Sequence, residues 1–220
     1  MALTVREVFA TMQGEGSMAG APAVFVRLAG CNLWSGLPHL RDAGTGACAA
    51  WCDTDFAKGT RHEPQEVADT VLRLCSGWAV PLVVVSGGEP CLQLRRPEGE
   101  ALVRLLHASG VRVAVETNGT TPADVLDEVD HVTVSPKALR APGTSALAHV
   151  VVRKGTDLKV VAPQWAEDDL RSMAEWSFTH RYVQPLDTGA GPGAVQPALE
   201  LAARLGWRVS AQVHKLLELP

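Results

Sequence analysis

No run of apolar residues in this 220-residue sequence reaches the length of about 18 that a membrane-spanning helix requires. The first residues are not a basic stretch followed by an apolar one, so we expect no secretory signal. Lysine and arginine number 20 against 24 acidic residues, so the net charge is −4 and there is no excess of positive charge for a nucleic-acid backbone. These absences predict a cytoplasmic protein that binds neither a membrane nor a nucleic acid.

Cysteine is scarce and odd in number. The five are Cys31, Cys48, Cys52, Cys75 and Cys91. An odd count without a secretory signal argues against a disulfide framework and favours a metal site or free thiols. The first three lie in one segment, and three thiolates can hold a four-iron cluster while one iron stays open to a small molecule. Trp51 precedes the last of the three, where its ring could pack against an adenine bound at that iron.

Two other interpretations of the cysteines remain open. A structural zinc site usually takes four ligands, and the nearby His39 and His62 lack the compact spacing of a zinc finger. The thiols could also be free and unrelated. Cys75 lies within a helical pattern and is expected in the core, and Cys91 is not expected to be a ligand.

The length and the composition, with 46% hydrophobic and 20% charged residues, fit a single domain over residues 1–220. Apolar runs typical of strands occur at 23–29, 82–85, 111–115, 131–134, 158–161, 182–183 and 207–211. Helical patterns lie at 64–75, 97–108, 122–129, 167–176 and 194–205, and three of them begin at a proline. Regions 35–47 and 138–153 are expected to be loops. This alternation predicts a mostly parallel sheet, and because a complete TIM barrel needs about 250 residues, we expect an abbreviated or open α/β barrel.

Polar clusters follow the predicted strands. They lie at 30–32, 86–90, 116–119, 135–137, 184–187 and 212–215. Because the carboxyl ends of parallel strands meet at one edge of the sheet, we expect these clusters to converge on one site.

An ordered set of short motifs runs the length of the chain. The motifs are Gln13-Gly14-Glu15-Gly16, Arg27-Leu28-Ala29-Gly30-Cys31-Asn32-Leu33-Trp34, Cys52-Asp53-Thr54-Asp55-Phe56, Ser86-Gly87-Gly88-Glu89-Pro90, Glu116-Thr117-Asn118-Gly119, Ser135-Pro136-Lys137, Leu158-Lys159-Val160-Val161, Gln184-Pro185-Leu186-Asp187 and an ending from His214 and Lys215 to Pro220. The set resembles the 7-carboxy-7-deazaguanine synthases of the radical S-adenosylmethionine superfamily. Gly-Gly-Glu-Pro alone marks only the superfamily, whereas the ordered set is far more specific.

The cysteine spacing departs from the superfamily's usual C-x3-C-x2-C. Sixteen residues separate Cys31 from Cys48, and three separate Cys48 from Cys52. Members of the family can carry a long insertion in the first gap, and an extra residue can bulge out of a Gly/Ala-rich loop in the second. The resemblance therefore implies Cys31, Cys48 and Cys52 as ligands of a [4Fe-4S] cluster and a radical S-adenosylmethionine core.

The resemblance also implies a reaction. S-adenosylmethionine at the open iron would yield a 5′-deoxyadenosyl radical, and the carbon–nitrogen lyase would convert 6-carboxy-5,6,7,8-tetrahydropterin into 7-carboxy-7-deazaguanine and ammonia. The product feeds 7-deazapurines such as queuosine. Mg²⁺ at Thr54, a reductase such as flavodoxin or ferredoxin, and a homodimer are implied as well. A dimer would also cover the sheet edges that a short barrel leaves.

Site residues follow from the same resemblance. Contacts with S-adenosylmethionine are implied for Trp51, Asp53, Gly88, Ser135, Pro136, Lys137, Gln184, Pro185, Leu186 and Asp187. Contacts with the substrate are implied for Met12, Gln13, Gly14, Glu15, Arg27, Ser86 and Pro220. Glu116 and His214, expected at strand ends on the same rim, are candidates for substrate binding or proton transfer.

Simpler roles stay open for several of these residues. Arg27 alternates with apolar residues in a strand, so its partner should be internal, either the substrate carboxylate or a structural ion pair. Thr54 and Asp187 are also typical of a turn or a helix cap, and Lys137 of a surface. Pro220 could belong to a frayed end.

Two other functions remain open. A radical activase that installs a glycyl radical on a partner protein would share the cysteine loop and Gly-Gly-Glu-Pro, but it would need an opening for a polypeptide. A zinc-stabilised binding module would not be an enzyme at all, and it would be colourless where a four-iron cluster is brown.

Overall fold

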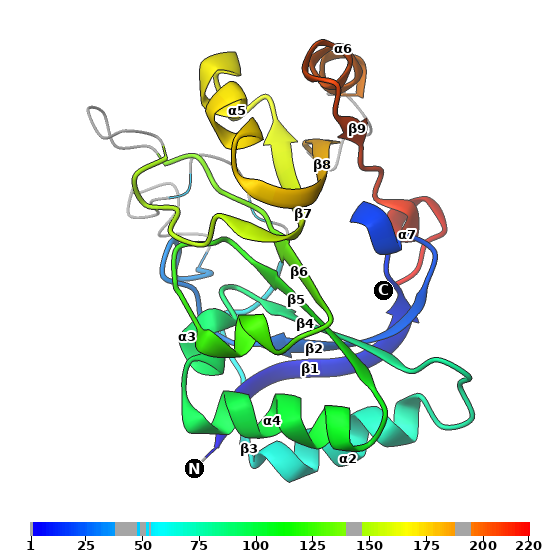
Figure 1. The fold of residues 1–220 in the computed structure, drawn as a ribbon. Helices are drawn as coiled ribbons and strands as arrows, with labels where there is room; N and C mark the ends of the chain where they lie inside the picture. The colour runs from blue at the N-terminus through cyan, green and yellow to red at the C-terminus, as the bar shows by residue number, and fades with distance from the viewer. Residues whose placement is uncertain (1, 38–47, 49–51, 53, 140–146, 188–194) are drawn as a thin grey trace.

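The computed structural model describes residues 2–37, 48, 52, 54–139, 147–187 and 195–220 (Figure 1). Within these residues one nine-stranded sheet has the order β3-β1-β2-β4-β5-β6-β7-β8-β9. The strands are β1 (Leu3–Met12), β2 (Pro22–Leu28), β3 (Thr60–His62), β4 (Leu82–Gly87), β5 (Arg112–Thr117), β6 (His131–Val134), β7 (Lys154–Ala162), β8 (Ser177–Pro185) and β9 (Arg208–Val209). From β2 through β4 to β9 neighbouring strands run parallel, whereas β1 is antiparallel to both β2 and β3.

Because β3 and β9 end the sheet without pairing with each other in the described chain, the barrel is open. The helices are α2 (Pro64–Leu74), α3 (Cys91–Leu94), α4 (Pro97–Ala108), α5 (Glu167–Ala174), α6 (Val195–Leu205) and α7 (Val213–Leu216), with short 3-10 helices η1 (Gly16–Met18) and η2 (Asp124–Asp127). In Figure 1, α2 and α4 lie below β1 and β2, and α5 and α6 lie at the opposite end of the sheet. The sequence-based prediction of an open, mostly parallel α/β barrel is confirmed.

Two apolar clusters hold the layers together. One joins β1, β2, β4 and β5 to α2 and α4, and the other joins β6, β7 and β8 to α5 and α6. Central valines such as Val83 and Val85 are fully buried. Each such side chain contributes roughly 1.5–3 kcal/mol by leaving water. The sheet is therefore a rigid platform for groups at its strand ends.

All seven predicted strands are present, and the helices expected at 64–75, 97–108, 167–176 and 194–205 are found within two residues at each end. The pattern at 122–129 forms only the short η2. The sequence did not predict β1, because polar residues such as Arg6 and Glu7 interrupt its apolar pattern, or the short β3, α3 and α7.

The expected loops are confirmed where the structure describes them. Residues 35–37, 138–139 and 147–153 contain no helix or strand, apart from an isolated bridge between Cys48 and Leu139. Residues 38–47 and 140–146 lie outside the described part. No helix among the described residues is long and apolar enough to cross a membrane.

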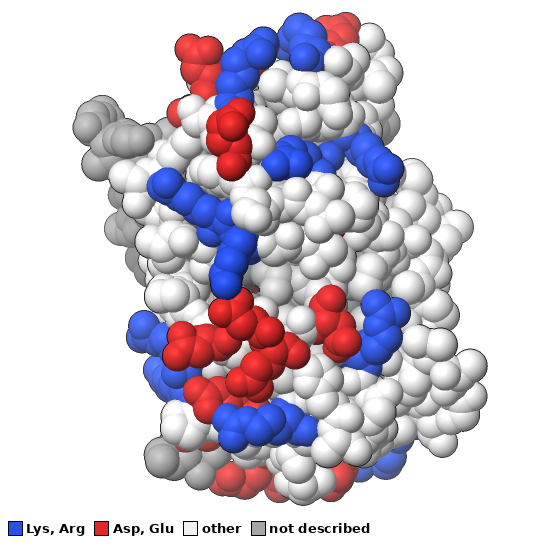
Figure 2. Space-filling model, viewed as in Figure 1, with Lys and Arg blue, Asp and Glu red and all other residues white. Residues whose placement is uncertain are grey.

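The face shown in Figure 2 carries mixed charge. Acidic side chains gather in the lower half of this view, and basic side chains lie beside them and above them.

Candidate active site

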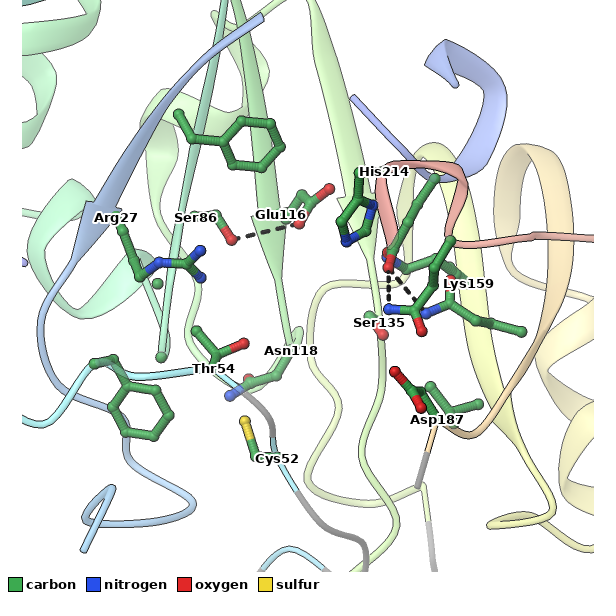
Figure 3. Close-up of a pocket in the computed structure, with 18 of the residues that line it drawn as sticks. Arg27, Cys52, Thr54, Ser86, Glu116, Asn118, Ser135, Lys159, Asp187 and His214 are labelled. Atoms are coloured by element: carbon green, nitrogen blue, oxygen red, sulfur yellow. Dashed lines mark hydrogen bonds and ion pairs between the residues drawn. The ribbon is translucent and has the colours of Figure 1, made fainter. Parts of the chain in front are cut away.

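A cavity of about 560 Å³ lies at the carboxyl ends of the parallel strands (Figure 3). All six polar clusters that follow the predicted strands contribute to its wall. Their contributions include Cys31, Ser86, Glu116, Ser135, Gln184 and Gln212. A parallel sheet brings these ends together, so segments spread over most of the chain form one site.

The proposed metal ligands line this cavity. Cys31, Cys48, Cys52 and Thr54 all reach the wall, and the cysteines are free thiols. Burial raises the pKa of the Cys31 thiol. Among the described residues, no three histidine, cysteine or acidic side chains are close enough to hold a metal ion. The donor set nevertheless fits a cluster chemically, because three thiols share one cavity and iron–sulfur clusters take thiolate ligands.

Two glycines let the next loop approach the first cysteine. Gly87 has φ +149°, and a Cβ there would lie 2.1 Å from the Leu28 carbonyl oxygen. A Cβ at Gly88 would lie 2.4 Å from the Gly30 oxygen and 2.7 Å from Cβ of Cys31. Only glycine fits at such a close backbone approach. The Gly-Gly-Glu-Pro turn is therefore packed directly against the Cys31 loop.

Glu89, for which the sequence predicted no role, connects this turn to the end of β5 by hydrogen bonds. Its buried carboxylate accepts hydrogen bonds from Thr117 Oγ1 at 2.7 Å, the Asn118 N–H at 2.7 Å and the Cys91 N–H at 2.9 Å. Burial raises the pKa of Glu89, while the hydrogen bonds act in the opposite direction. The carboxylate satisfies backbone donors at the start of α3 and after β5, and so fixes the spacing of the two segments.

The residues assigned to S-adenosylmethionine lie mostly at the ends of β6 and β8. Ser135, Lys137 and residues 184–187 line the cavity, whereas Pro136 is not among the lining residues. Lys137 Nζ donates to Ser135 Oγ at 2.8 Å, and Lys215 Nζ of α7 lies 2.6 Å from Asp187 Oδ2. Trp51 and Asp53 lie outside the described residues.

A hydrogen-bonded chain joins the end of β1 to β4 and β5 at the cavity wall. Gln13 Nε2 donates to Glu116 Oε1 at 2.9 Å, and Ser86 Oγ lies 3.4 Å from Glu116 Oε2 (Figure 3). Arg27 Nε donates to Glu7 at 2.7 Å, and its guanidinium lies 5.7 Å from the Phe9 ring centroid. Both side chains line the cavity, but Glu7 is 47% exposed, so this partner is not the internal one that the sequence predicted.

The end of β1 and the last residue of the chain meet at this wall. Met12 and Pro220 line the cavity, and Thr11 Oγ1 donates to a Pro220 oxygen at 2.9 Å. Gly14 does not line it but packs against α7, since a Cβ there would lie 1.9 Å from Nδ1 of His214. His214 lies in α7; the prediction that it ends a strand was wrong, because β9 stops at Val209.

Sequence reasoning assigned no site role to Lys159, which lies in β7 and reaches the cavity (Figure 3). Its ammonium forms a buried ion pair with Glu15. Oε1 of Glu15 also accepts hydrogen bonds from Gln184 at 3.1 Å and Gln212 at 2.8 Å. The available signal was a charged residue between Leu158 and Val160, the same pattern that drew attention to Arg27.

The open, mostly parallel α/β barrel, with three cysteines and a Gly-Gly-Glu-Pro turn around one cavity at its strand ends, has the architecture of the radical S-adenosylmethionine superfamily. A crystal structure of QueE from Escherichia coli has the same fold, with a TM-score of 0.71, 24% sequence identity, and coverage of 97% of this chain and 95% of that one. No protein-family model matches the chain.

Curated relatives identify the family. The chain is 42% identical to the 7-carboxy-7-deazaguanine synthase of Burkholderia multivorans, 40% to that of Bordetella pertussis and 41% to that of Caulobacter vibrioides, each over 100% of both chains. The chain belongs to the 7-carboxy-7-deazaguanine synthase family.

Proposed function

We propose that the chain is a radical S-adenosylmethionine lyase that converts 6-carboxy-5,6,7,8-tetrahydropterin into 7-carboxy-7-deazaguanine and ammonia. The observation that carries the proposal is the 42% identity with a synthase of that name over the full length of both chains. The cavity supports it, because thiols and a set of polar groups line the same space.

Cys31, Cys48 and Cys52 would hold a [4Fe-4S] cluster, and Gly88 would let the methionyl part of S-adenosylmethionine approach the backbone. When bound, these groups supply the radical that starts the reaction. Ser135, Pro136, Lys137 and residues 184–187 would orient the cofactor, together with Trp51 and Asp53. Their role would be to position the cofactor and to exclude water from it.

The remaining polar groups would bind the substrate. Arg27 uses Nε for Glu7, so its terminal nitrogens are available for the substrate carboxylate. Glu116 is oriented by Gln13 and Ser86, which suits it to accept a hydrogen bond or a proton from the ring. His214 is the second candidate for that proton. Met12, Gly14, Glu15 and Pro220 would complete the pocket.

Further features belong to the same proposal. Thr54 would contribute to a Mg²⁺ site shared with substrate oxygens and water. A flavodoxin or ferredoxin would reduce the cluster, and the enzyme would act in the cytoplasm without a nucleic-acid or membrane partner. A homodimer is supported by exposed apolar residues near the β9 edge, among them Leu199 and Leu216, which are 50% and 77% exposed.

The test is a complete turnover assay. The protein is reconstituted anaerobically with iron and sulfide, reduced, and given S-adenosylmethionine and 6-carboxy-5,6,7,8-tetrahydropterin. Mass spectrometry is expected to detect 5′-deoxyadenosine and 7-carboxy-7-deazaguanine together. If 5′-deoxyadenosine forms alone, the proposed substrate is wrong. If neither forms from a protein with an intact brown cluster, the proposed function is wrong.

A further inference from the structure

Glu15 and Lys159 form a buried ion pair between distant parts of the chain. Glu15 follows β1, and Lys159 lies in β7. Their side chains are 13% and 7% exposed, and both line the cavity. A pair in this position is costly to desolvate and gives weak evidence of a purely stabilising role.

The cavity wall formed by Glu15, Lys159 and Gln184 uses only part of its hydrogen-bonding capacity. An ionised carboxylate has about four acceptor positions and an ammonium has three donors. Glu15 receives Lys159, Gln184 and Gln212, which leaves about one position. Within the described residues, Lys159 Nζ donates only to Glu15, and the buried Oε1 of Gln184 has no hydrogen-bond partner. The wall therefore offers a ligand one acceptor position on Glu15 and the remaining donors of Lys159, whereas Gln184 Oε1 is enclosed by protein atoms.

We propose that Lys159 is a specificity-determining residue that holds Glu15 as a fixed, ionised acceptor for the pyrimidinone edge of the substrate. The inference rests on the proposed function. That edge of a reduced pterin carries a carbonyl oxygen next to a ring N–H and an amino group. Glu15 accepts from one of the two N–H groups, and Lys159 donates to the carbonyl oxygen. A ring that lacks this order of groups leaves buried donors or acceptors unpaired.

The charges around the pair explain why Lys159 is needed. Burial alone would raise the pKa of Glu15, but the charge and hydrogen bond of Lys159, with help from His214, outweigh it and lower the pKa to about 2. Burial also opposes the charge of Lys159, whose pKa is nevertheless raised by Glu15, Glu116 and Asp157. Without Lys159, the hydrogen bond of Gln212 and the charge of His214 would remain to oppose burial, which is the largest single effect and favours protonated Glu15. A protonated carboxyl group donates, and so it would oppose an N–H of the substrate.

The experiment measures substrate binding without turnover. 6-Carboxy-5,6,7,8-tetrahydropterin is titrated anaerobically into cluster-loaded, unreduced protein with S-adenosylmethionine, at pH 6, 7 and 8. For Lys159→Met we expect affinity at pH 7 to fall by about 10- to 150-fold, the range for a lost charged hydrogen bond. This loss should shrink as pH rises and Glu15 ionises, by up to about tenfold per pH unit. The ratio between wild type and Lys159→Arg should stay constant with pH.

The matched control is Lys154→Met, the same substitution in the same strand. Lys154 pairs with Asp127 at the surface, where both side chains are 67% exposed, and its loss should leave binding unchanged. Glu15→Gln cannot ionise, so its binding should be weak and should follow the pH profile of the wild type. Lys159→Gln replaces Lys159→Met if the latter does not load a cluster.

The outcomes separate the two claims. Wild-type affinity in Lys159→Met, or a loss that does not change with pH relative to the wild type, overturns the role of Lys159. A wild-type protein that makes no 7-carboxy-7-deazaguanine overturns the proposed function instead, whatever the variants bind.

Discussion

The assignment of three cluster ligands depends on Cys48, because the spacing between Cys48 and Cys52 departs from the superfamily pattern. Cys48→Ala leaves two of the three assigned cysteine ligands, Cys31 and Cys52, and by our proposal a cluster without its third protein ligand. We expect the variant to lose cleavage of S-adenosylmethionine entirely, with 5′-deoxyadenosine below detection by mass spectrometry and less than half of the wild-type iron per chain. Retained cleavage would rule out the three-ligand assignment.

Cys75→Ala is the control for that substitution. Cys75 is buried beside α2 and does not line the cavity. The Cys75→Ala variant should therefore lose some stability, because a small cavity is left, but it should keep its iron and its cleavage activity.

Gly88 sets the distance between two loops of the site. In Gly88→Ala the new methyl group would meet the Gly30 oxygen and Cβ of Cys31, at 2.4 and 2.7 Å, and one loop would have to move. We expect about 1–3 kcal/mol of lost stability, typical of overpacking, and reduced iron loading measured after reconstitution. Gly110→Ala, where a Cβ meets nothing within 4 Å, should load iron normally despite its φ of +75°. Equal iron contents would contradict this account.

At this scale the sequence predicted the polar residues that follow strands. Ser86, Glu116 and Ser135 were found because a polar cluster after an apolar run is a visible signal. Lys159 was not, because it interrupts an apolar run instead of following one, and its proposed role depends on Glu15, which is 144 residues away. Pairing across that separation depends on how the sheet curves, which no local pattern records.

At the scale of elements, the segment 13–18 connects the first strand to the far half of the sheet. Gln13 bonds Glu116 in β5, and Glu15 bonds Lys159 in β7. Ser17 donates through its N–H and its hydroxyl to the buried Asp157, at 2.7 Å and 2.8 Å. Burial raises the pKa of Asp157, but hydrogen bonds from His131 and Ser17 lower it overall. The segment therefore fixes β1 against β5 and β7.

The Glu15–Lys159 pair should make the stability of this connection depend on pH. Glu15→Gln leaves Lys159 buried without its counter-charge, and we expect a loss of about 3–5 kcal/mol at pH 7 in urea unfolding. The folded pKa of Glu15 is about 2, below its ordinary value of 4.5, so its contribution is present above pH 4.5 and is lost as pH falls through about 2. The difference in the free energy of unfolding between wild type and Glu15→Gln should therefore become smaller as the pH falls from 4.5 to about 2. A difference that stays constant would show that ionisation of Glu15 is not its source.

The elements that the sequence did not predict are those whose form depends on such contacts. The strand β1 has a partly exposed, polar pattern, and it is ordered by pairing with β2 and β3 rather than by its own apolar run. The four-residue α7 is held by the N–H of Val213, which donates to the Gly14 oxygen at 2.9 Å. Strands buried on both faces, in contrast, can be predicted because they are continuous apolar runs in the sequence.

At the scale of the whole molecule, an open barrel collects one site from both of its halves. The three cysteines assigned to the cluster come from the segment after β2. The residues assigned to S-adenosylmethionine come mostly from β8 and the loop after β6. A ligand that contacts both groups would hold the two apolar clusters of the sheet together. Binding of such a ligand to the folded state alone must raise stability by mass action.

Cluster-loaded protein should therefore become more stable with S-adenosylmethionine. At a concentration of 100 Kd the gain is about 2.7 kcal/mol, which raises the Tm of a chain of this size by roughly 5–10 °C in calorimetry. Iron-free protein and Cys48→Ala should gain much less at the same concentration, because the amino and carboxylate groups of the ligand then have no iron, or much less of it, to bind. 5′-Deoxyadenosine lacks those groups, so it should shift the Tm of all three preparations by the same small amount. If S-adenosylmethionine stabilised the iron-free protein as strongly as the loaded one, the polar residues at the ends of β6 and β8 would bind it without the cluster. The three cysteines would then serve the reaction and not the binding.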